Sequence, residues 1–350
     1  MPRALDASNI EPRCPGMPGD GPLAQLVERH VYTVDVIGSS PVGPTMRTVA
    51  SARRSGAWAL ILASLFWGTT GTAASFMPEN VSPVAIGAST MAIGGLLLFI
   101  VSARASIAAI QDAASRRWLL IGSIGVFVYP LAFYSSMDLA GVAIGNVVSL
   151  GTGPMFAALL EWVFERRRLS GLWVVCTAVA LAGVVLLAAG AHREASSTGT
   201  NVALGVGVGF AAGLAYALYT YSSSRGIHSG QSSRGVMGGM FGIGAIGLLP
   251  VLLVFGAPLM QSPTTISIAA YLAIGPMFVA YLLFGIGMRT LRSSTATTIT
   301  LLEPVVATLL AILVVGERLD ALGWIGIVLI LTSITVLATA RQPPTVTFEP

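Results

Sequence analysis

Long runs of apolar residues follow one another along most of the chain, separated by short polar stretches. Each run is close to the roughly 20 residues that an α-helix needs to cross the hydrocarbon core of a bilayer. Within the runs the apolar residues are continuous rather than alternating, which excludes the strands of a membrane β-barrel. The pattern therefore predicts an all-α, polytopic membrane protein with about ten transmembrane helices. The predicted spans are 57–77, 82–102, 117–137, 141–163, 171–190, 202–222, 235–255, 266–288, 293–315 and 321–340.

Composition supports lipid as the main solvent of the chain. Of the 350 residues, 54% are hydrophobic and 10% are charged, whereas soluble domains contain about 25% charged residues. Glycine is abundant, with 40 residues, and small residues allow transmembrane helices to approach closely. We expect close helix packing in the seventh predicted span, which is rich in glycine. Its glycines are Gly238, Gly239, Gly242, Gly244 and Gly247.

The arginines indicate the orientation of the spans. Lysine is absent, so all 19 basic residues are arginine. With the N-terminus in the cytoplasm, fourteen of the sixteen arginines after Met46 fall in cytoplasmic segments, and only Arg193 and Arg318 fall outside. Because basic residues favour the cytoplasmic side, we expect a multi-pass protein of the cytoplasmic membrane with both termini inside. The same pattern explains the net charge of +4 without a nucleic-acid partner.

Residues 1–45 form a separate segment that is polar, rich in proline and without an apolar run of spanning length. One interpretation is a disordered, non-membrane extension. The other rests on residues 21–45, whose codons can be chosen so that the arms of a transfer RNA gene appear in the right order. On this second interpretation Met1 is a misplaced start of translation, and we expect the protein to begin at Met46.

The chain resembles itself at an offset near 150 residues. The stretch from Pro154 to Leu160 matches that from Pro304 to Leu310, and Arg168-Leu169 matches Arg318-Leu319. A shared offset indicates an internal repeat, so we divide the membrane part into 46–195 and 196–350, with five helices each. Because five is odd, the second repeat enters the membrane from the opposite side. Inverted repeats are typical of secondary transporters, whose substrate sites lie near the membrane midplane.

Several short motifs resemble those of the EamA family in the drug/metabolite transporter superfamily. They are Trp67-Gly68-Thr69, Leu302-Glu303-Pro304-Val305, Val315-Gly316-Glu317-Arg318-Leu319 and the stretch from Gly326 to Leu331. The resemblance covers residues 57–340 and implies ten helices around a central cavity, with transport of small metabolites that is often outward. One departure is Arg167-Arg168, which stands where the second repeat has Glu317-Arg318.

Two acidic residues fall deepest in the predicted spans, Glu161 and Glu303. A carboxylate there is costly and tends to be protonated or paired, which makes it a functional candidate. The alternative to a functional role is a structural one, in which the carboxyl group makes a hydrogen bond between two packed helices. Glu303 stands beside Pro304 in the repeated motif, whereas Glu161 lies close to the arginines at 166–168. Proton coupling through either acid and passive facilitation are both compatible with the sequence.

Other candidates for the substrate pathway are uncharged. Pro154 and Pro304 occupy matching positions, where each proline acts either as a simple kink or as a hinge that frees a carbonyl. Asn146 makes either a packing bond or a substrate contact. Trp67, its counterpart Tyr216, and Tyr281 line a cavity or anchor the helices at the interface. Tyr129, Tyr134 and Tyr219 belong to the same group of aromatic candidates.

The leading hypothesis is a secondary transporter of a small metabolite, such as an amino acid or an amine, that works as an exporter. A nucleotide-sugar or phosphate-ester exchanger would need a basic residue in the cavity, and every arginine after Met46 maps near a span end or loop. An intramembrane enzyme would need a nucleophile, base or metal cluster, and none is visible. A non-transporting sensor or assembly protein is the remaining class. We expect no enzymatic activity, cofactor or metal, and the expected partners are a small-molecule substrate, the bilayer and, in a coupled mechanism, protons. The sequence does not indicate an oligomeric state.

Overall fold

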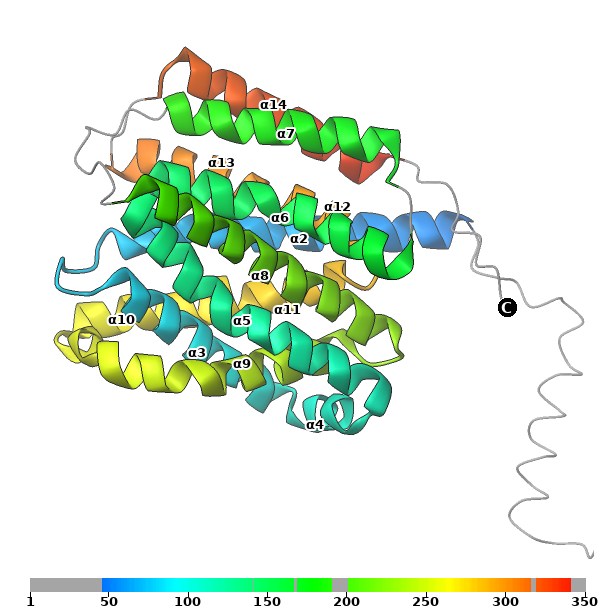
Figure 1. Ribbon diagram of the computed structural model, residues 1–350, viewed down its shortest axis with the longest axis horizontal. Helices are drawn as coiled ribbons and strands as arrows, with labels where there is room; N and C mark the ends of the chain where they lie inside the picture. The colour runs from blue at the N-terminus through cyan, green and yellow to red at the C-terminus, as the bar shows by residue number, and fades with distance from the viewer. Residues whose placement is uncertain (1–45, 141, 167–168, 191–200, 316–318, 341–350) are drawn as a thin grey trace, which may run out of the picture. The chain divides into compact units, whose positions relative to one another are not determined.

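The computed structural model describes residues 46–140, 142–166, 169–190, 201–315 and 319–340, and the regular elements within them are helices (Figure 1). Ten segments of the described chain are long and apolar enough to span a membrane. The predicted all-α class and the number of spans are therefore confirmed. The segment 1–45, to which the misplaced start was assigned, lies outside the described residues.

The first five spans are single helices. They are α2 (Met46–Ala74), α3 (Pro83–Val101), α5 (Ala113–Ala140), α6 (Val142–Glu165) and α7 (Gly171–Gly190). A short helix, α4 (Ala103–Gln111), connects α3 to α5 where the sequence predicted only a loop.

The sixth, seventh and tenth spans are also single helices, α8 (Val202–His228), α9 (Ser233–Phe255) and α14 (Ala321–Thr339). The eighth and ninth spans are composite. The eighth consists of α10 (Pro263–Leu272), the π-helical η2 (Ala273–Val279) and α11 (Ala280–Gly287), and the short 3-10 helix η1 (Ala257–Met260) precedes it. The ninth consists of α12 (Ser293–Ile299), α13 (Leu302–Leu310) and the π-helical η3 (Ala311–Val315).

Polar residues in the loops fix where several helices begin. Each has a side-chain oxygen that accepts a hydrogen bond from the backbone N–H three residues on, which satisfies one of the open donors of the first helical turn. In α3 and α10 a proline follows at the start of the helix, where its missing N–H costs nothing. The capping residues are Ser82, Asn201, Ser232, Ser262 and Asp320.

Spans that hold the same place in the two halves pack against each other. α3 packs on α9, and α7 lies beside α14 along one edge of the bundle (Figure 1). Both pairs are antiparallel. Gly238 near the start of α9 meets Leu98 near the end of α3, and Gly190 at the end of α7 meets Gly323 at the start of α14. The predicted inverted repeats require this arrangement.

Glycine makes these contacts possible, as predicted for the seventh span. A Cβ atom on Gly238 of α9 would lie 2.8 Å from the carbonyl oxygen of Leu98 in α3. A Cβ on Gly239 or Gly244 would meet side chains of α5 at 2.7 and 2.5 Å. Because ordinary contacts are longer, only glycine allows α9 to lie so close to its neighbours.

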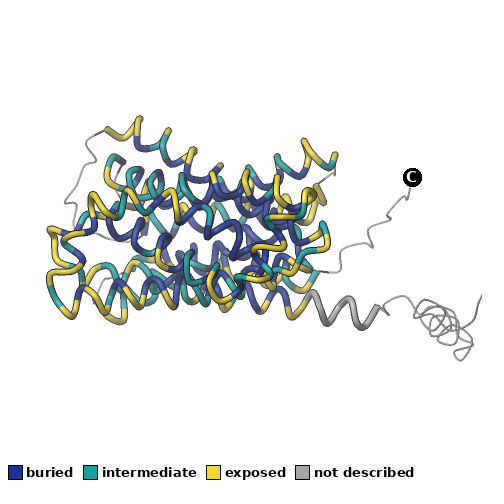
Figure 2. The backbone as a smooth tube through the Cα atoms, turned by 90° about the horizontal axis from the view of Figure 1, so that it is seen from below, coloured by how far each residue is buried: buried dark blue, intermediate teal, exposed yellow. Residues whose placement is uncertain are grey.

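The sixth span is longer than hydropathy predicted. The prediction ended at residue 222, but α8 continues to His228. Residues 222–224 are serines that are buried inside the bundle rather than exposed in a loop. Figure 2 shows burial along the described part of the chain, with buried residues inside the bundle and exposed residues on its outer faces.

The described arginines lie at one end of the bundle, where α3, α6, α8 and α11 finish. We refer to this as the arginine-rich end. It comprises Arg54, Arg104, Arg116, Arg117, Arg166, Arg225, Arg234, Arg289 and Arg292. The opposite end contains the loop at 75–82 between α2 and α3.

Candidate functional site

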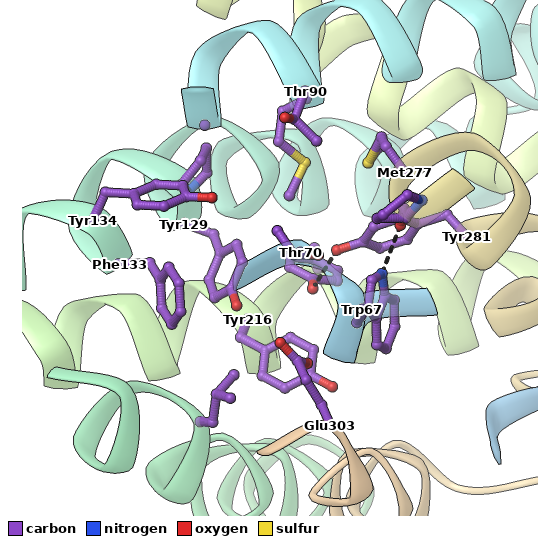
Figure 3. Close-up of a pocket in the computed structure, with 16 residues that line it drawn as sticks. Trp67, Thr70, Thr90, Tyr129, Phe133, Tyr134, Tyr216, Met277, Tyr281 and Glu303 are labelled. Atoms are coloured by element: carbon purple, nitrogen blue, oxygen red, sulfur yellow. Dashed lines mark hydrogen bonds between the residues drawn. The ribbon is translucent and has the colours of Figure 1, made fainter. Parts of the chain in front are cut away.

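A cavity lies in the half of the bundle away from the arginine-rich end, and Figure 3 shows the residues that line it. Trp67 and Thr70 border it from the last two turns of α2, and Gly87 and Thr90 from the first two turns of α3. Its empty space, counted together with the open mouth, is about 600 Å³. The remaining lining residues are Met91, Tyr129, Pro130, Phe133, Tyr134, Leu150, Tyr216, Tyr219, Pro276, Met277, Tyr281 and Glu303.

Seven of the sixteen residues that line the cavity are aromatic. The rings of Trp67 and Tyr281 lie 5.1 Å apart, and those of Tyr129 and Tyr216 lie 5.7 Å apart. Such tilted contacts hold rings in fixed orientations. The Trp67 indole N–H donates to the carbonyl oxygen of Pro276 at 2.8 Å, and the hydroxyls of Tyr219 and Tyr281 are hydrogen-bonded at 2.9 Å. The polar atoms of Trp67, Tyr219 and Tyr281 are therefore paired, which fixes these rings at the cavity wall.

Glu303 provides the acidic group of the cavity. The ninth span is interrupted at residues 300–301, and Glu303 lies in the first turn of α13, just after the break. Figure 3 shows its side chain extending from α13 into the space between the aromatic rings. Within the described chain, no basic side chain lies within ion-pair distance of Glu303, and none of the residues that line the cavity is basic. The cavity thus presents one carboxyl group surrounded by π faces.

The structure brings four of the predicted pathway residues together. Trp67, Tyr216, Tyr281 and Glu303 all border the cavity. Pro304 lies directly behind Glu303, buried in the first turn of α13 rather than in mid-helix. Pro154, its counterpart in the repeat, lies inside the continuous helix α6. The two matched prolines therefore sit in different local structures, and only the second follows a break.

The other candidates lie away from the cavity wall. Pro154 is buried in α6 and does not border the cavity. Asn146, also in α6, has a buried Oδ1 atom with no hydrogen-bond partner among the described residues. Glu161 is only 3% exposed and accepts two hydrogen bonds from Ser294, one from its backbone N–H and one from its Oγ, both at 2.9 Å. A part for Asn146, Pro154 or Glu161 in the substrate pathway remains a prediction.

Several cavity residues were not selected from the sequence. Thr70, Thr90, Phe133, Met91 and Met277 resemble ordinary residues of apolar helices, and only the packing of the helices decides which of them face inward. Thr70 had one usable signal, because it follows Trp67 by three residues and so shares its helix face. No group of three or more His, Cys, Asp or Glu side chains in the described chain is arranged to hold a metal ion.

Ten apolar helices, built as two halves around a cavity, define a multi-pass membrane protein of the transporter type. The family comparison makes this specific. The sequence profile of the EamA-like transporter family matches residues 54–189 and again residues 203–339. The chain therefore belongs to the EamA-like transporter family, and the predicted resemblance and the two-repeat architecture are confirmed.

Curated relatives carry transporter names. The chain is 30% identical over 287 residues to YwfM of Bacillus subtilis (strain 168), described as an uncharacterized transporter, which covers 81% of this chain and 93% of the relative. It is 24% identical over 293 residues to YicL of Salmonella typhimurium, described as an uncharacterized inner membrane transporter. That match spans 81% of this chain and 95% of the relative. A solved crystal structure without a functional description shares the fold, with a TM-score of 0.67 and 22% identity, over 81% of this chain and 96% of the other.

Proposed function

We propose that the protein is a proton-coupled secondary transporter that exports a small organic amine across the cytoplasmic membrane. The observation that carries this proposal is the composition of the cavity wall, in which aromatic rings surround the carboxyl group of Glu303 and no basic residue takes part. A transporter of this family binds a small molecule during its cycle, and the described cavity is the space suited to hold it.

An amine fits this wall better than other metabolites. A cation over the face of a tryptophan or tyrosine gains about 0.5–2 kcal/mol when water is excluded. A carboxylate adds a strong attraction, of about 4 kcal/mol at 4 Å for an effective dielectric constant near 20. An amino acid shares the ammonium group, but its carboxylate would find no basic partner on the wall. A phosphate ester or nucleotide sugar lacks a partner for the same reason.

Proton coupling follows if the Glu303 carboxyl group binds both the proton and the cationic substrate. A carboxyl group in a cavity of low dielectric constant is unfavourable as an isolated charge, so it binds either a proton or a cationic substrate. Exclusive binding makes the two ligands exchange for each other. An inward proton gradient then drives the amine outward. The gathering of arginines at one end supports a cytoplasmic position for that end and for both termini. The cavity lies in the other half of the bundle, which this orientation places toward the outside of the cell.

The experiment uses benzyltrimethylammonium, a permanently charged aromatic cation that does not cross lipid as a neutral base. Purified protein is reconstituted into liposomes with an acidic interior, and accumulation of the labelled cation is measured. We expect accumulation that collapses with the pH gradient and that is lost in Glu303→Gln. The control, Glu79→Gln, changes an exposed carboxyl in the loop at 75–82, outside the cavity, and should retain gradient-driven accumulation.

Competition defines the substrate class. We expect 2-phenylethylamine to inhibit accumulation and the neutral analogue 2-phenylethanol of similar size to inhibit much less. Equal inhibition by the alcohol would show that the cavity does not recognise charge. Inhibition by a phosphate ester would favour the exchanger, and accumulation that ignores the pH gradient would show a facilitator.

A further inference from the structure

The arginine-rich half of the ninth span carries an unusual number of buried hydroxyl groups. Residues 293–300 read Ser-Ser-Thr-Ala-Thr-Thr-Ile-Thr, and the serines and threonines among them are at most 3% exposed. Ser294, Thr297 and Thr300 precede Glu303 at steps of three residues. Ser294 and Thr297 are neighbours on α12, the Thr300 hydroxyl donates to the carbonyl oxygen of Thr297, and the Glu303 backbone N–H donates to the carbonyl oxygen of Thr300 across the break. They therefore form a continuous polar row, which we call the hydroxyl row, leading from Glu303 toward the arginine-rich end.

The hydroxyl row runs between two candidate residues that the sequence analysis selected independently, Tyr216 at the cavity and Glu161 near the arginine-rich end. At the cavity, Thr300 Oγ1 lies 2.6 Å from the hydroxyl of the cavity residue Tyr216. At the other end, Ser294 donates two hydrogen bonds to Glu161. Ser294 and Glu303 are nine residues apart in the sequence, which corresponds to about 13 Å at the rise of an α-helix. Glu161 thus marks the far end of a polar line that begins at the cavity.

The wall opposite this row contains an unpaired hydroxyl. α8 packs against α12, and Thr220 lies one helical turn beyond Tyr216 toward the arginine-rich end. Thr220 is fully buried, and its Oγ1 has no hydrogen-bond partner among the described residues. A buried unpaired hydroxyl costs roughly 1–3 kcal/mol. Such a group is better explained if water or a ligand reaches it in another conformation.

Thr298 provides a comparison, because its hydroxyl group has a purely structural role between two packed helices. Thr298 is adjacent to Thr297 and equally buried, but its Oγ1 bonds with Thr177 Oγ1 of α7 at 3.0 Å. That bond joins two helices directly. The Thr297 hydroxyl instead donates to backbone carbonyls of its own helix, at Ser293 and Ser294, and joins no other helix.

We infer that the hydroxyl row is the closed half of the transport pathway, and that Glu161 and Ser294 stand at its inner end. The inference rests on the proposed function only in taking the cavity as the substrate site. In this structure the cavity lies in the half of the bundle away from the arginine-rich end, and the hydroxyl row between the cavity and that end is buried. When access alternates, water and substrate then reach Glu303 from the arginine-rich end, along Ser294, Thr297 and Thr300.

An ion pair closes the inner end of this row. Arg225 of α8 and Glu165 of α6 approach to 3.4 Å, one helical turn beyond Glu161. The Arg225 guanidinium also lies 5.3 Å from the centre of the Trp118 ring in α5. The Arg225 side chain is 38% exposed, and pairs of this kind stabilise by only about 0–1 kcal/mol. Such a bridge holds α6 and α8 together but opens readily.

Cysteine accessibility tests the inference without knowledge of the substrate. The full chain is freed of its cysteines by Cys14→Ala and Cys176→Ala, and Thr297→Cys is compared with Thr298→Cys. The probe is 2-aminoethyl methanethiosulfonate, a small cation, and labelling of the reconstituted protein is followed by mass spectrometry. We expect Thr297→Cys to react at least tenfold faster, because only this position becomes wet when the inner half opens.

Equal reaction rates of the two variants would overturn the inference. If either variant fails to fold, Ser294→Cys on the row is compared with Ser333→Cys in α14, since serine and cysteine are nearly isosteric and both positions are at most 3% exposed. In that pair too, only the first should react. Labelling requires neither an amine nor a proton gradient. Fast labelling without amine transport would reject the proposed substrate, whereas amine transport without selective labelling would reject the hydroxyl row.

Discussion

The contact between α7 and α14 depends on glycine, and Gly326→Ala should weaken it measurably. A Cβ atom at Gly326 would lie 2.5 Å from the carbonyl oxygen of Gly183 and 2.7 Å from the backbone nitrogen of Leu187. Both are backbone atoms of α7, so no side chain can turn away. Reaching an ordinary contact of about 3.4 Å requires the helices to separate by about 1 Å.

The expected cost combines two terms of opposite sign. Overpacking costs roughly 1–3 kcal/mol, and replacing glycine by alanine within a helix recovers roughly 0.5–1 kcal/mol. We therefore expect Gly326→Ala to destabilise the protein by about 1–2 kcal/mol. The matched control is Gly207→Ala in α8, where a Cβ would meet nothing within 4 Å. This control should be neutral or slightly stabilising.

The assay is thermal unfolding of the purified variants in one detergent, followed by intrinsic fluorescence and by retention of the monodisperse peak on size exclusion. We expect the unfolding midpoint of Gly326→Ala to fall below that of the wild type, and that of Gly207→Ala to equal or exceed it. If Gly326→Ala proves as stable as Gly207→Ala, the close antiparallel contact between these equivalent spans is wrong.

Three further predictions concern the two ends of the bundle and the cavity. In a cysteine-free background, Asn80→Cys should react with an impermeant thiol reagent in intact cells and Ser232→Cys should not; the reverse pattern would invert the orientation. Tyr216→Phe keeps the aromatic face and should change the affinity for benzyltrimethylammonium by less than about threefold, whereas Tyr216→Leu should weaken it roughly 2- to 30-fold, the equivalent of 0.5–2 kcal/mol. Arg225→Gln should lower stability by less than about 1 kcal/mol yet speed the labelling of the hydroxyl row; unchanged labelling would show that its ion pair is not a closure.

The spans were predictable because each depends on a local property, a long continuous run of apolar residues. Two helical segments, α4 and the end of α8, were not predicted, because both contain polar residues and so lack the continuous apolar run on which the prediction rests. α4 is nine residues long and contains Arg104, so it gave no apolar run and was expected to be a loop. The end of α8 was placed too early because Ser222, Ser223 and Ser224 are polar, although the bundle buries them.

The cavity was predictable only in part. Trp67, Tyr216, Tyr281 and Glu303 stand out by residue type and by their places in the repeat, and the structure gathers them around one space. The sequence alone did not show that Glu161 lies elsewhere, because both acids fall within apolar runs. Their difference arises from partners far away in the chain, since Glu161 accepts hydrogen bonds from Ser294 while Glu303 faces the cavity.

The central claim is that a proton and a cationic substrate compete for Glu303. The most direct measurement is proton release when benzyltrimethylammonium binds to the purified protein in weakly buffered solution, recorded with a pH indicator at several pH values. This ligand has no ionisable proton, so any proton released must come from the protein. We predict release from the wild type and from Glu79→Gln, and none from Glu303→Gln at any ligand concentration. Saturating binding to the wild type without proton release, or equal release from Glu303→Gln, would contradict the account.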